Sequence, residues 1–251
     1  MGWQPDFIAL YLPYTVVPEC LWSAQVPRIG LAADWNLLWH DYRRSLRACH
    51  LVLTDAAGVD VMAREGIAHA QAFNLFGCER AYLEPPPDDK PRDIDVLFVG
   101  NLHPAVQRER LPWLGRLARL ADHRRVAIHT GVFGADYRDL LQRARIVFNR
   151  SIRGECNRRA IEAAASGALL FQEAGNLETP SYFTDRRECV YYDNDNLLDL
   201  LEHYLDHEDE RLTIAEAAQR RAARYSFEEQ WQTFVESKAW QIQTRRQEET
   251  R

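Results

Sequence analysis

The sequence has no long hydrophobic run, and its cysteines are few and scattered. Nowhere in the 251 residues does an apolar stretch approach the roughly 20 residues that span a membrane. The five cysteines stand singly, without a Cys-x-x-Cys pair, so the sequence predicts neither a disulfide framework nor a zinc ribbon. Reduced thiols in the cytoplasm are the simplest interpretation.

Several motifs with well-defined chemistry are also missing. The stretch "GVFG" (131–134) is too short for the Gly-x-Gly-x-x-Gly fingerprint of dinucleotide sites. The histidines show no metal-ligand spacing, and no serine stands in Gly-x-Ser-x-Gly. The N-terminus lacks the basic start of a signal peptide, and the net charge of −6 argues against a general nucleic-acid-binding surface. We therefore expect a cytoplasmic protein with no metal, no cofactor and no nucleic-acid partner.

What the sequence does contain is a regular alternation of short apolar runs and amphipathic stretches. Runs typical of buried strands occur at 6–12, 27–34, 50–55 and 70–76, and then at 93–101, 125–131, 144–149, 168–173 and 188–193. Helical spacing separates most of them and continues beyond Asn196. This alternation predicts an α/β protein with two Rossmann-like parallel-sheet domains.

A proline-rich stretch, "EPPPDDKPRD" (84–93), interrupts the alternation. Three consecutive prolines cannot continue a helix or a central strand, so we interpret this stretch as an interdomain linker. The predicted organisation is a partial N-terminal domain at 1–84, a linker at 85–92, a C-terminal domain at 93–225, and a C-terminal helix and tail at 226–251.

The stretch "NRSIRGECNRRAIEAAASGALLFQEAG" (149–175) concentrates charge between a predicted strand and a predicted helix. Ligands of open parallel sheets bind beyond the carboxyl ends of the strands, where this loop is expected to lie. A helix N-terminus suits an anion, and Arg153, Arg158 and Arg159 add forked donors that match phosphate oxygens. Glu162, on the same helix face as Arg159, offers a carboxylate to a sugar hydroxyl. These residue types indicate a site for a nucleoside diphosphate.

Plainer interpretations account for the same residues equally well. A glutamate near a helix start stabilises the helix dipole without any ligand, and arginine clusters are often solvated ion pairs. The "DND" motif (193–195) invites a metal site, but Asx residues just before a helix are caps first. We interpret Asp193 as a cap.

The second half of the chain resembles the C-terminal domain of GT-B glycosyltransferases, over roughly 93–240. The resemblance is carried, in order, by "ARIVFNRSIRGECNRRAIEAAASGALLFQEAGN", by "ECVYYDNDNLLDLLEHYLDHEDERLTIAEAA" and by "YSFEEQW". It is greatest to the group 1-like family that includes spore-maturation-type enzymes. The resemblance implies a metal-independent transferase of the hexosyltransferase type. Such an enzyme moves a sugar from a nucleotide-sugar donor to a glycan, protein or small-molecule acceptor.

The resemblance also implies roles for individual residues. Glu162 matches the glutamate that holds the donor's ribose, and Arg159 matches the arginine near the diphosphate. Gly100 and Asn101 match the end of the domain's first strand, and Gly131 matches the end of its second. Together with Arg153 and the loop after the strand at 144–149, the predicted donor site comprises Arg159, Glu162, Asn149, Ser151, Arg153, Gly100, Asn101 and Gly131.

The sequence departs from the family pattern in two respects. Many retaining members carry two glutamates with seven residues between them, whereas Glu155 and Glu162 have six between. The first domain resembles only the later half of its counterpart, without the opening strands and the glycine-rich first loop. We therefore expect a truncated N-terminal domain. The alternative function is a non-catalytic module that binds a nucleotide or a partner protein.

Overall fold

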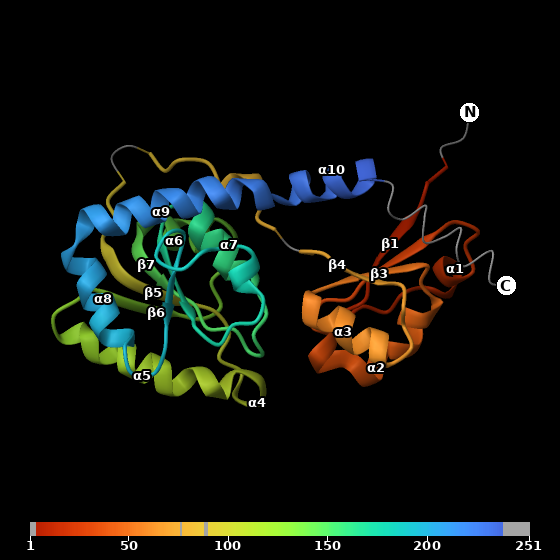
Figure 1. Cartoon of the computed structure of the whole chain (residues 1–251), viewed down its shortest axis with the longest axis horizontal. Helices are drawn as coiled ribbons and strands as arrows, with labels where there is room; N and C mark the ends of the chain where they lie inside the picture. Colours follow the sequence, from red (N-terminus) through yellow and green to blue (C-terminus); the bar gives the residue numbers. More distant parts are fainter. Residues whose placement is uncertain (1–3, 76, 88–89, 238–251) are drawn as a thin grey trace. The chain divides into compact units, whose positions relative to one another are not determined.

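The structure is a computed structural model that describes residues 4–75, 77–87 and 90–237 (Figure 1). It divides into two compact units. Unit 1 holds the described residues up to 75 together with those from Glu229 onward, and unit 2 spans Gly77–Glu228. Each unit is built on its own parallel sheet.

Unit 1 contains a sheet of four parallel strands in the order β1-β2-β3-β4. The strands are β1 (Ile8–Tyr11), β2 (Arg28–Leu31), β3 (Leu51–Thr54) and β4 (Ala70–Ala72). The helices are α1 (Glu19–Trp22), α2 (Trp35–Ala48), α3 (Ala56–Arg64) and α10 (Phe227–Ser237), the last of which begins in unit 2.

The two faces of the unit 1 sheet are covered by different parts of the chain. On one face, Leu10 and Val52 pack with Leu46 of α2 and Met62 of α3. On the other face, Ile29 and Leu53 pack with Phe234 of α10. The ring of Phe234 also contacts that of Phe73 at a centroid distance of 5.6 Å. A helix from the far end of the sequence therefore completes the core of unit 1.

Unit 2 contains a sheet of five parallel strands in the order β6-β5-β7-β8-β9. The strands are β5 (Ile94–Val99), β6 (Val126–His129), β7 (Ala144–Phe148), β8 (Leu169–Glu173) and β9 (Val190–Tyr192). The helices are α4 (Pro104–Gln107), α5 (Leu111–Arg119), α6 (Gly134–Arg143), α7 (Arg158–Ala165), α8 (Leu197–Asp206) and α9 (Glu208–Ala222). Short 3₁₀ turns occur at Arg80–Tyr82, Arg108–Arg110, Leu120–Asp122, Thr179–Ser181 and Ala223–Tyr225. The predicted class, two parallel-sheet α/β domains, is confirmed.

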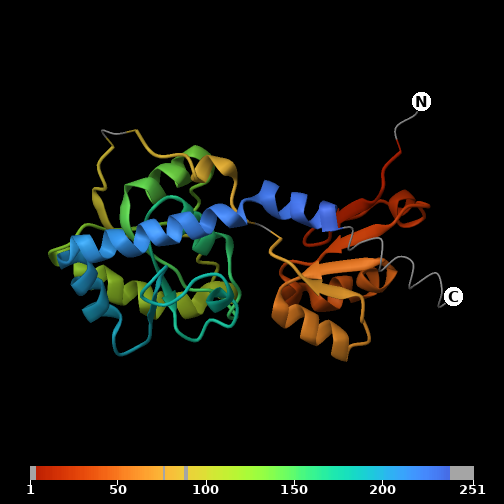
Figure 2. The same cartoon turned by 45° about the horizontal axis from the view of Figure 1, so that its top comes forward.

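The strands of unit 2 are apolar on both faces because helices cover both faces. Val96 and Phe98 of β5 pack into one core with α5 and α8, whereas Leu97 and Val99 pack into a second core with α6, α7 and α9. The successive residues of β5 thus point alternately to opposite layers. Figures 1 and 2 show the resulting sandwich of helices, sheet and helices.

Helix starts follow the sequence signals in part. Asp55 caps α3 by accepting a hydrogen bond from the backbone N–H of Gly58, at 2.6 Å. Helix α5 begins at Leu111, with Pro112 in its first turn, where proline is well tolerated. Asp34 stands at the expected cap position of α2, but its side chain caps nothing and its backbone is left-handed. An aspartate just before a helix is expected to cap it with its side chain, and here that expectation is wrong.

The boundary between the units differs in position from the predicted linker at 85–92. The units divide at Gly77, and the described part of the proline-rich stretch lies within unit 2. Its basic residues explain this placement. Lys90 donates a hydrogen bond to the Gln142 side chain, and Arg92 donates to the backbone carbonyls of Ala144 and Ser166. The stretch is anchored to α6, β7 and α7 rather than running between sheets.

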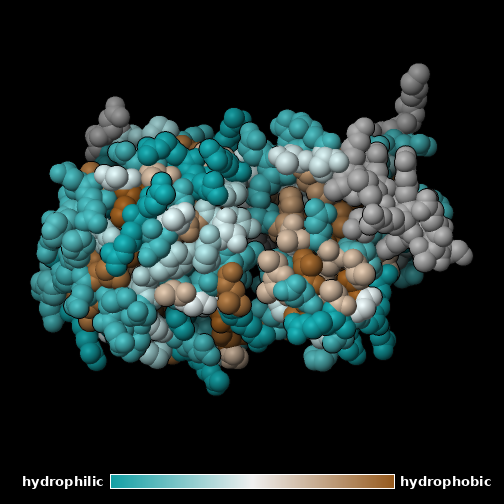
Figure 3. Space-filling view, viewed as in Figure 1, coloured by the Kyte–Doolittle hydropathy of each residue, from teal (hydrophilic) through white to brown (hydrophobic). Residues whose placement is uncertain are grey.

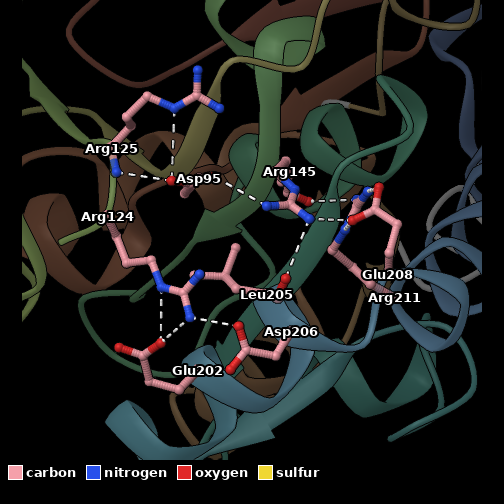
Figure 4. A network of polar contacts seen from close by, with 9 residues as sticks. All are labelled: Asp95, Arg124, Arg125, Arg145, Glu202, Leu205, Asp206, Glu208 and Arg211. Carbon is pink, nitrogen blue, oxygen red and sulfur yellow. Dashed lines mark hydrogen bonds and ion pairs between the residues drawn. The ribbon is translucent and has the colours of Figure 1, made fainter.

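An ion-pair network fixes helices α8 and α9 at the amino ends of the unit 2 strands (Figure 4). Arg145, at the start of β7, pairs with Asp95 of β5 and with Glu208 of α9. The buried Arg211 pairs with the same Glu208 at 2.5 Å. These charges are satisfied by one another, at the sheet edge opposite to the carboxyl ends of the strands.

The face of the molecule seen in Figure 3 is mostly hydrophilic, with apolar side chains in small patches. None of the helices formed by the described residues is long and apolar enough to cross a membrane.

Candidate functional site

The carboxyl ends of β5, β6 and β7 form the edge of unit 2 at which ligands of such sheets bind. Gly100 directly follows β5, Asn149 directly follows β7, and Gly131 lies two residues beyond β6. In the sheet, β5 lies between the other two strands. Three of the predicted site residues are therefore gathered at one edge by the strand order alone.

Helix α7 brings two more predicted residues to this edge. The Asn157 side chain caps the helix by accepting a hydrogen bond from the backbone N–H of Ala160. The following alanines are small enough to bury the helix against the sheet, and Arg159 through Ala165 are all buried. The short, closely packed helix carries Arg159 and Glu162 into the protein rather than out to solvent.

The guanidinium of Arg159 is held in place from several sides. Its Nε donates to the Val99 carbonyl at 2.6 Å, and its Nη1 donates to Asn149 Oδ1 at 2.8 Å. Its Cζ lies 4.7 Å from the ring centroid of Phe98, and the residue is 9% exposed. Burial lowers the pKa of Arg159 from its ordinary value.

The remaining nitrogen of Arg159, Nη2, lies against the backbone of Gly100. A Cβ atom at Gly100 would stand 1.9 Å from this nitrogen. Only glycine fits here, so the two predicted residues are in direct contact. The arrangement places a fixed positive charge immediately beneath the end of β5.

Glu162 lies one turn further along α7 and is 3% exposed. It accepts hydrogen bonds from the Tyr137 hydroxyl at 2.9 Å and from Arg158 Nε at 3.1 Å. Burial raises the pKa of this carboxyl, and Arg158 opposes the rise. A buried carboxylate with these partners keeps acceptor capacity for further hydroxyl groups.

Asn149 and Ser151 are also buried, but their side chains hold the loop together. Asn149 donates to Asn157 Oδ1 at 3.0 Å and to Gln172 Oε1 at 2.7 Å. Ser151 donates its backbone N–H and its hydroxyl to the buried Glu173. Both residues connect the loop after β7 to its neighbours.

The other predicted residues are more accessible. Asn101 and Gly131 are exposed, and Gly131 has a left-handed backbone with φ of 69°. Arg153 is exposed in the loop before α7, where its backbone N–H donates to Glu155 at 2.8 Å. The Glu155 carboxylate also accepts from the backbone N–H of Ile152, so it closes this loop.

A cavity of about 310 Å³ opens beside the same loop, over the ends of β7, β8 and β9. Its lining includes Ser151 and Arg153, but not Gly100, Arg159 or Glu162. The predicted site residues therefore do not all line one cavity. Asp193 also lines the cavity, and its Oδ1 accepts from the backbone N–H groups of Asp195 and Asn196. Asp193 thus closes a turn ahead of α8, whose N-cap is Asn196 without a side-chain cap bond, so the interpretation of Asp193 as the helix cap was wrong.

Arg110 belongs to this site, and the sequence analysis missed it. Its Nη1 donates to the Asn101 carbonyl at 3.0 Å, and its Nε donates to the Arg150 carbonyl at 3.1 Å. It thereby joins the loops that follow β5 and β7. Burial and, to a smaller extent, the neighbouring Arg159 lower its pKa to about 10. The available signal was its position in line with Leu114 and Leu117 on an apolar helical face.

The described residues contain no group of three or more His, Cys, Asp or Glu side chains arranged to hold a metal ion.

Comparison with known proteins assigns the chain to a family. The sequence profile of the glycosyl transferase-like family matches residues 80–236, which include every predicted donor-site residue. A search of curated proteins finds no match.

Solved structures share the fold at low sequence identity. The crystal structure of HepE from Anabaena in complex with UDP superposes with a TM-score of 0.64 at 15% identity, covering 85% of this chain and 72% of that one. Sucrose-phosphate synthase from Thermosynechococcus elongatus gives 0.61 at 13% identity, covering 94% and 74%. TarM of S. aureus gives 0.62 at 10% identity, covering 84% of this chain and 50% of that one. The chain therefore belongs to the glycosyl transferase-like family and has the GT-B fold.

Proposed function

We propose that the protein transfers a sugar from a nucleoside diphosphate sugar to a hydroxyl group of an acceptor, without a metal ion. The contact between Arg159 and Gly100, beside the buried Glu162, is the observation that carries this proposal. It places a fixed cation and a carboxylate at the sheet edge where ligands of this fold class bind.

The donor's diphosphate would lie over Gly100. The missing side chain there lets phosphate oxygens approach the backbone and Arg159 Nη2 closely. Because the guanidinium is already held by Val99 and Asn149, it need not be ordered when the ligand arrives. In the reaction, this preorganised charge would stabilise the negative charge that develops on the leaving diphosphate.

The donor's ribose would bind Glu162. Ribose hydroxyls are hydrogen-bond donors, and a carboxylate accepts more hydrogen bonds than the two that Tyr137 and Arg158 supply. Its partial desolvation strengthens each such bond.

The base would lie against the loop between β6 and α6. Phe133 in this loop is 75% exposed and follows the left-handed Gly131. An exposed aromatic ring beside a glycine offers a stacking surface for a base. UDP is the first nucleotide to test, since the structurally similar HepE was crystallised with UDP and with UDP-glucose.

We also propose a cytoplasmic location. All five cysteines are free thiols, which suits a reducing compartment.

The test is calorimetric titration of the purified chain with UDP, GDP and ADP, each with and without magnesium. Arg159→Ala is a poor probe, because it would also leave the Val99 carbonyl and Asn149 without their donor. Glu162→Gln keeps the size of the side chain and removes the charge. We expect it to weaken nucleotide binding roughly tenfold or more. Glu216→Gln, on the exposed face of α9 in the same unit, is the matched control and should bind as the wild type does.

Failure of the wild type to bind any of the three nucleotides would refute the proposal. Nucleotide binding without release of UDP from UDP-glucose, across a panel of saccharide acceptors, would favour the alternative of a non-catalytic module.

A further inference from the structure

The buried carboxylate of Glu162 is anchored at both of its oxygens. The Tyr137 hydroxyl donates a hydrogen bond to Oε2 at 2.9 Å, and Arg158 Nε donates one to Oε1 at 3.1 Å. The first donor comes from α6 and the second from α7 itself. The terminal torsion of a glutamate has a broad energy profile, so the bonds to the oxygens decide how the carboxylate is turned. One bond to each oxygen fixes its plane.

The fixed carboxylate keeps acceptor positions on both oxygens. An ionised carboxylate has about four of them, and the hydrogen bonds that the described residues make to Glu162 occupy one on each oxygen. A ribose carries two neighbouring hydroxyl groups, at C2′ and C3′, and both are hydrogen-bond donors. The carboxylate is therefore anchored on one side and open to a pair of donors on the other.

The fold alone does not account for this pattern. Burying a charge is costly unless hydrogen bonds replace its hydration. Glu173, also buried in unit 2, meets this requirement, since it accepts from Ser151, Gln172 and Asn176. Glu162 accepts only two bonds from the described residues, and desolvation raises the pKa of its carboxyl group. Its hydration is replaced in part, which leaves room for bonds from a ligand.

Tyr137 is itself held in place as a donor. Its ring packs edge-on against the ring of the buried Tyr82, at a centroid distance of 6.2 Å. Burial, and then the nearby charge of Glu162, raise the pKa of Tyr137 well above its ordinary value. The hydroxyl therefore keeps its proton and stays available as a donor to Glu162.

Arg158 holds the other oxygen, and a second carboxylate holds Arg158. Its Nη2 lies 3.5 Å from Glu79 Oε1, while its Nε bonds to Glu162. Its side chain is half-exposed, so the ion pair with Glu79 alone is expected to contribute little. The shared guanidinium nevertheless restricts the direction from which it meets Glu162.

We infer that Tyr137 is a positioning residue of the donor site, which together with Arg158 fixes the orientation in which Glu162 accepts hydrogen bonds from the ribose. This role rests on the proposed function, because it requires a ribose at Glu162. Tyr137 need not touch the nucleotide, since it acts through the carboxylate. Its hydroxyl should therefore contribute to the affinity only for nucleotides that carry the ribose hydroxyls.

The experiment is calorimetric titration of the whole chain with UDP, GDP and ADP and with the 2′,3′-dideoxy analogue of each. The ratio of the two affinities, here called the ribose preference, measures the bonds to the ribose hydroxyls. Tyr137→Phe removes the hydroxyl and keeps the ring. Tyr191→Phe is the matched control, because the Tyr191 hydroxyl donates to the Phe183 carbonyl at 3.2 Å in the same unit.

A second variant tests the other anchor of the carboxylate. Arg158→Gln removes the charge and the bond to Oε1. Its matched control is Arg220→Gln, which removes an exposed arginine that pairs with Glu216 on α9. Loss of a positive charge by itself should weaken the ribonucleotide and its dideoxy analogue equally, so it leaves the ribose preference unchanged.

We expect the wild type to bind the ribonucleotide about tenfold or more tightly than its dideoxy analogue. Tyr137→Phe should lower this preference about threefold or more, with the affinity for the dideoxy analogue unchanged. Arg158→Gln should lower the preference as well, and both controls should keep the wild-type preference. Thermal melts check that the variants are folded. If Tyr137→Phe does not fold, the ribose preference of Arg158→Gln decides the outcome in the same way.

Three results would overturn the role of Tyr137, and they differ in what else they overturn. Folded variants that keep the wild-type ribose preference would leave the proposed function intact. A wild type that binds a nucleotide without any ribose preference would also remove the ribose from Glu162, while nucleotide binding stands. A wild type that binds no nucleotide would overturn the proposed function as well.

Discussion

Substituting Gly100 with alanine tests whether Arg159 is held as rigidly as the structure shows. The added Cβ would lie 1.9 Å from Arg159 Nη2 and 3.0 Å from its Cζ. The guanidinium cannot swing aside cheaply, because its other two nitrogens are bonded to the Val99 carbonyl at 2.6 Å and to Asn149 Oδ1 at 2.8 Å. The methyl group must displace either the strand end or both hydrogen bonds.

The expected loss of stability can be taken from the effect of overpacking in other protein cores. A methyl group forced into a filled site destabilises a protein by about 1–3 kcal/mol. In a chain of this length, each kcal/mol lowers the melting temperature by about 2–4 °C. Gly100→Ala should therefore lower the calorimetric melting temperature of unit 2 by roughly 2–12 °C. If Arg159 also binds the donor's diphosphate, the displaced guanidinium should weaken UDP binding as well.

Gly115→Ala provides the matched control. Gly115 lies inside α5, and a Cβ there would meet no atom within 4 Å. Alanine in a helix interior is favoured over glycine by about 1 kcal/mol, so this variant should melt higher than the wild type. The reasoning about Arg159 is refuted if Gly100→Ala melts at or above the wild-type temperature while Gly115→Ala rises as expected. In that case the guanidinium is mobile and does not form a preorganised site.

Two further predictions concern the proposed base site and the ion-pair network. Phe133→Ala should weaken UDP binding about tenfold in calorimetric titration, because it removes a stacking surface. The melting temperature should change little, since the Phe133 side chain is 75% exposed. An unchanged affinity for UDP would exclude stacking on this ring. Glu208, hydrogen-bonded by Arg211 and Arg145, has its pKa lowered to about 2 from an ordinary value of 4.5. The stabilisation it provides is therefore complete above about pH 4.5 and is lost as the pH falls toward 2. Between pH 4.5 and 2, the melting temperature should fall less steeply for Glu208→Gln than for the wild type. Parallel curves for the two proteins would show that the ion pairs of Glu208 do not stabilise the fold.

The layout of the sheets could be predicted from the sequence because its signals are local. An apolar run such as "DVLFVG" is buried on both faces wherever it lies in a parallel sheet, so its composition alone identifies a strand. The cap at Asp55 and the proline in the first turn of α5 are equally local. The proximity of Gly100 to Arg159, in contrast, does not follow from a local signal. These residues are separated by some 60 positions, and the sequence suggested a common site only through family resemblance.

Other features depend on contacts that no local pattern specifies. Asn149 and Ser151 were predicted to face a ligand, yet their side chains are committed to Gln172 and Glu173 on the next strand. Whether a polar side chain binds a ligand or a neighbouring residue depends on which side chains the adjacent strand places opposite it. The register between the two strands cannot be derived from the sequence.

The sequence by itself determined that this chain forms two parallel sheets, that helices cover both faces of the second, and that charge gathers at one strand end. Only the tertiary structure decided which residues each charged side chain contacts. Arg159 points inward against Gly100, and Arg110 joins two loops. Asp34 stands at the start of α2, but its side chain does not cap the helix. The physical reason is that secondary structure follows from the periodicity of neighbouring residues, whereas the partner of a buried polar group is chosen among residues that folding alone brings within hydrogen-bonding distance.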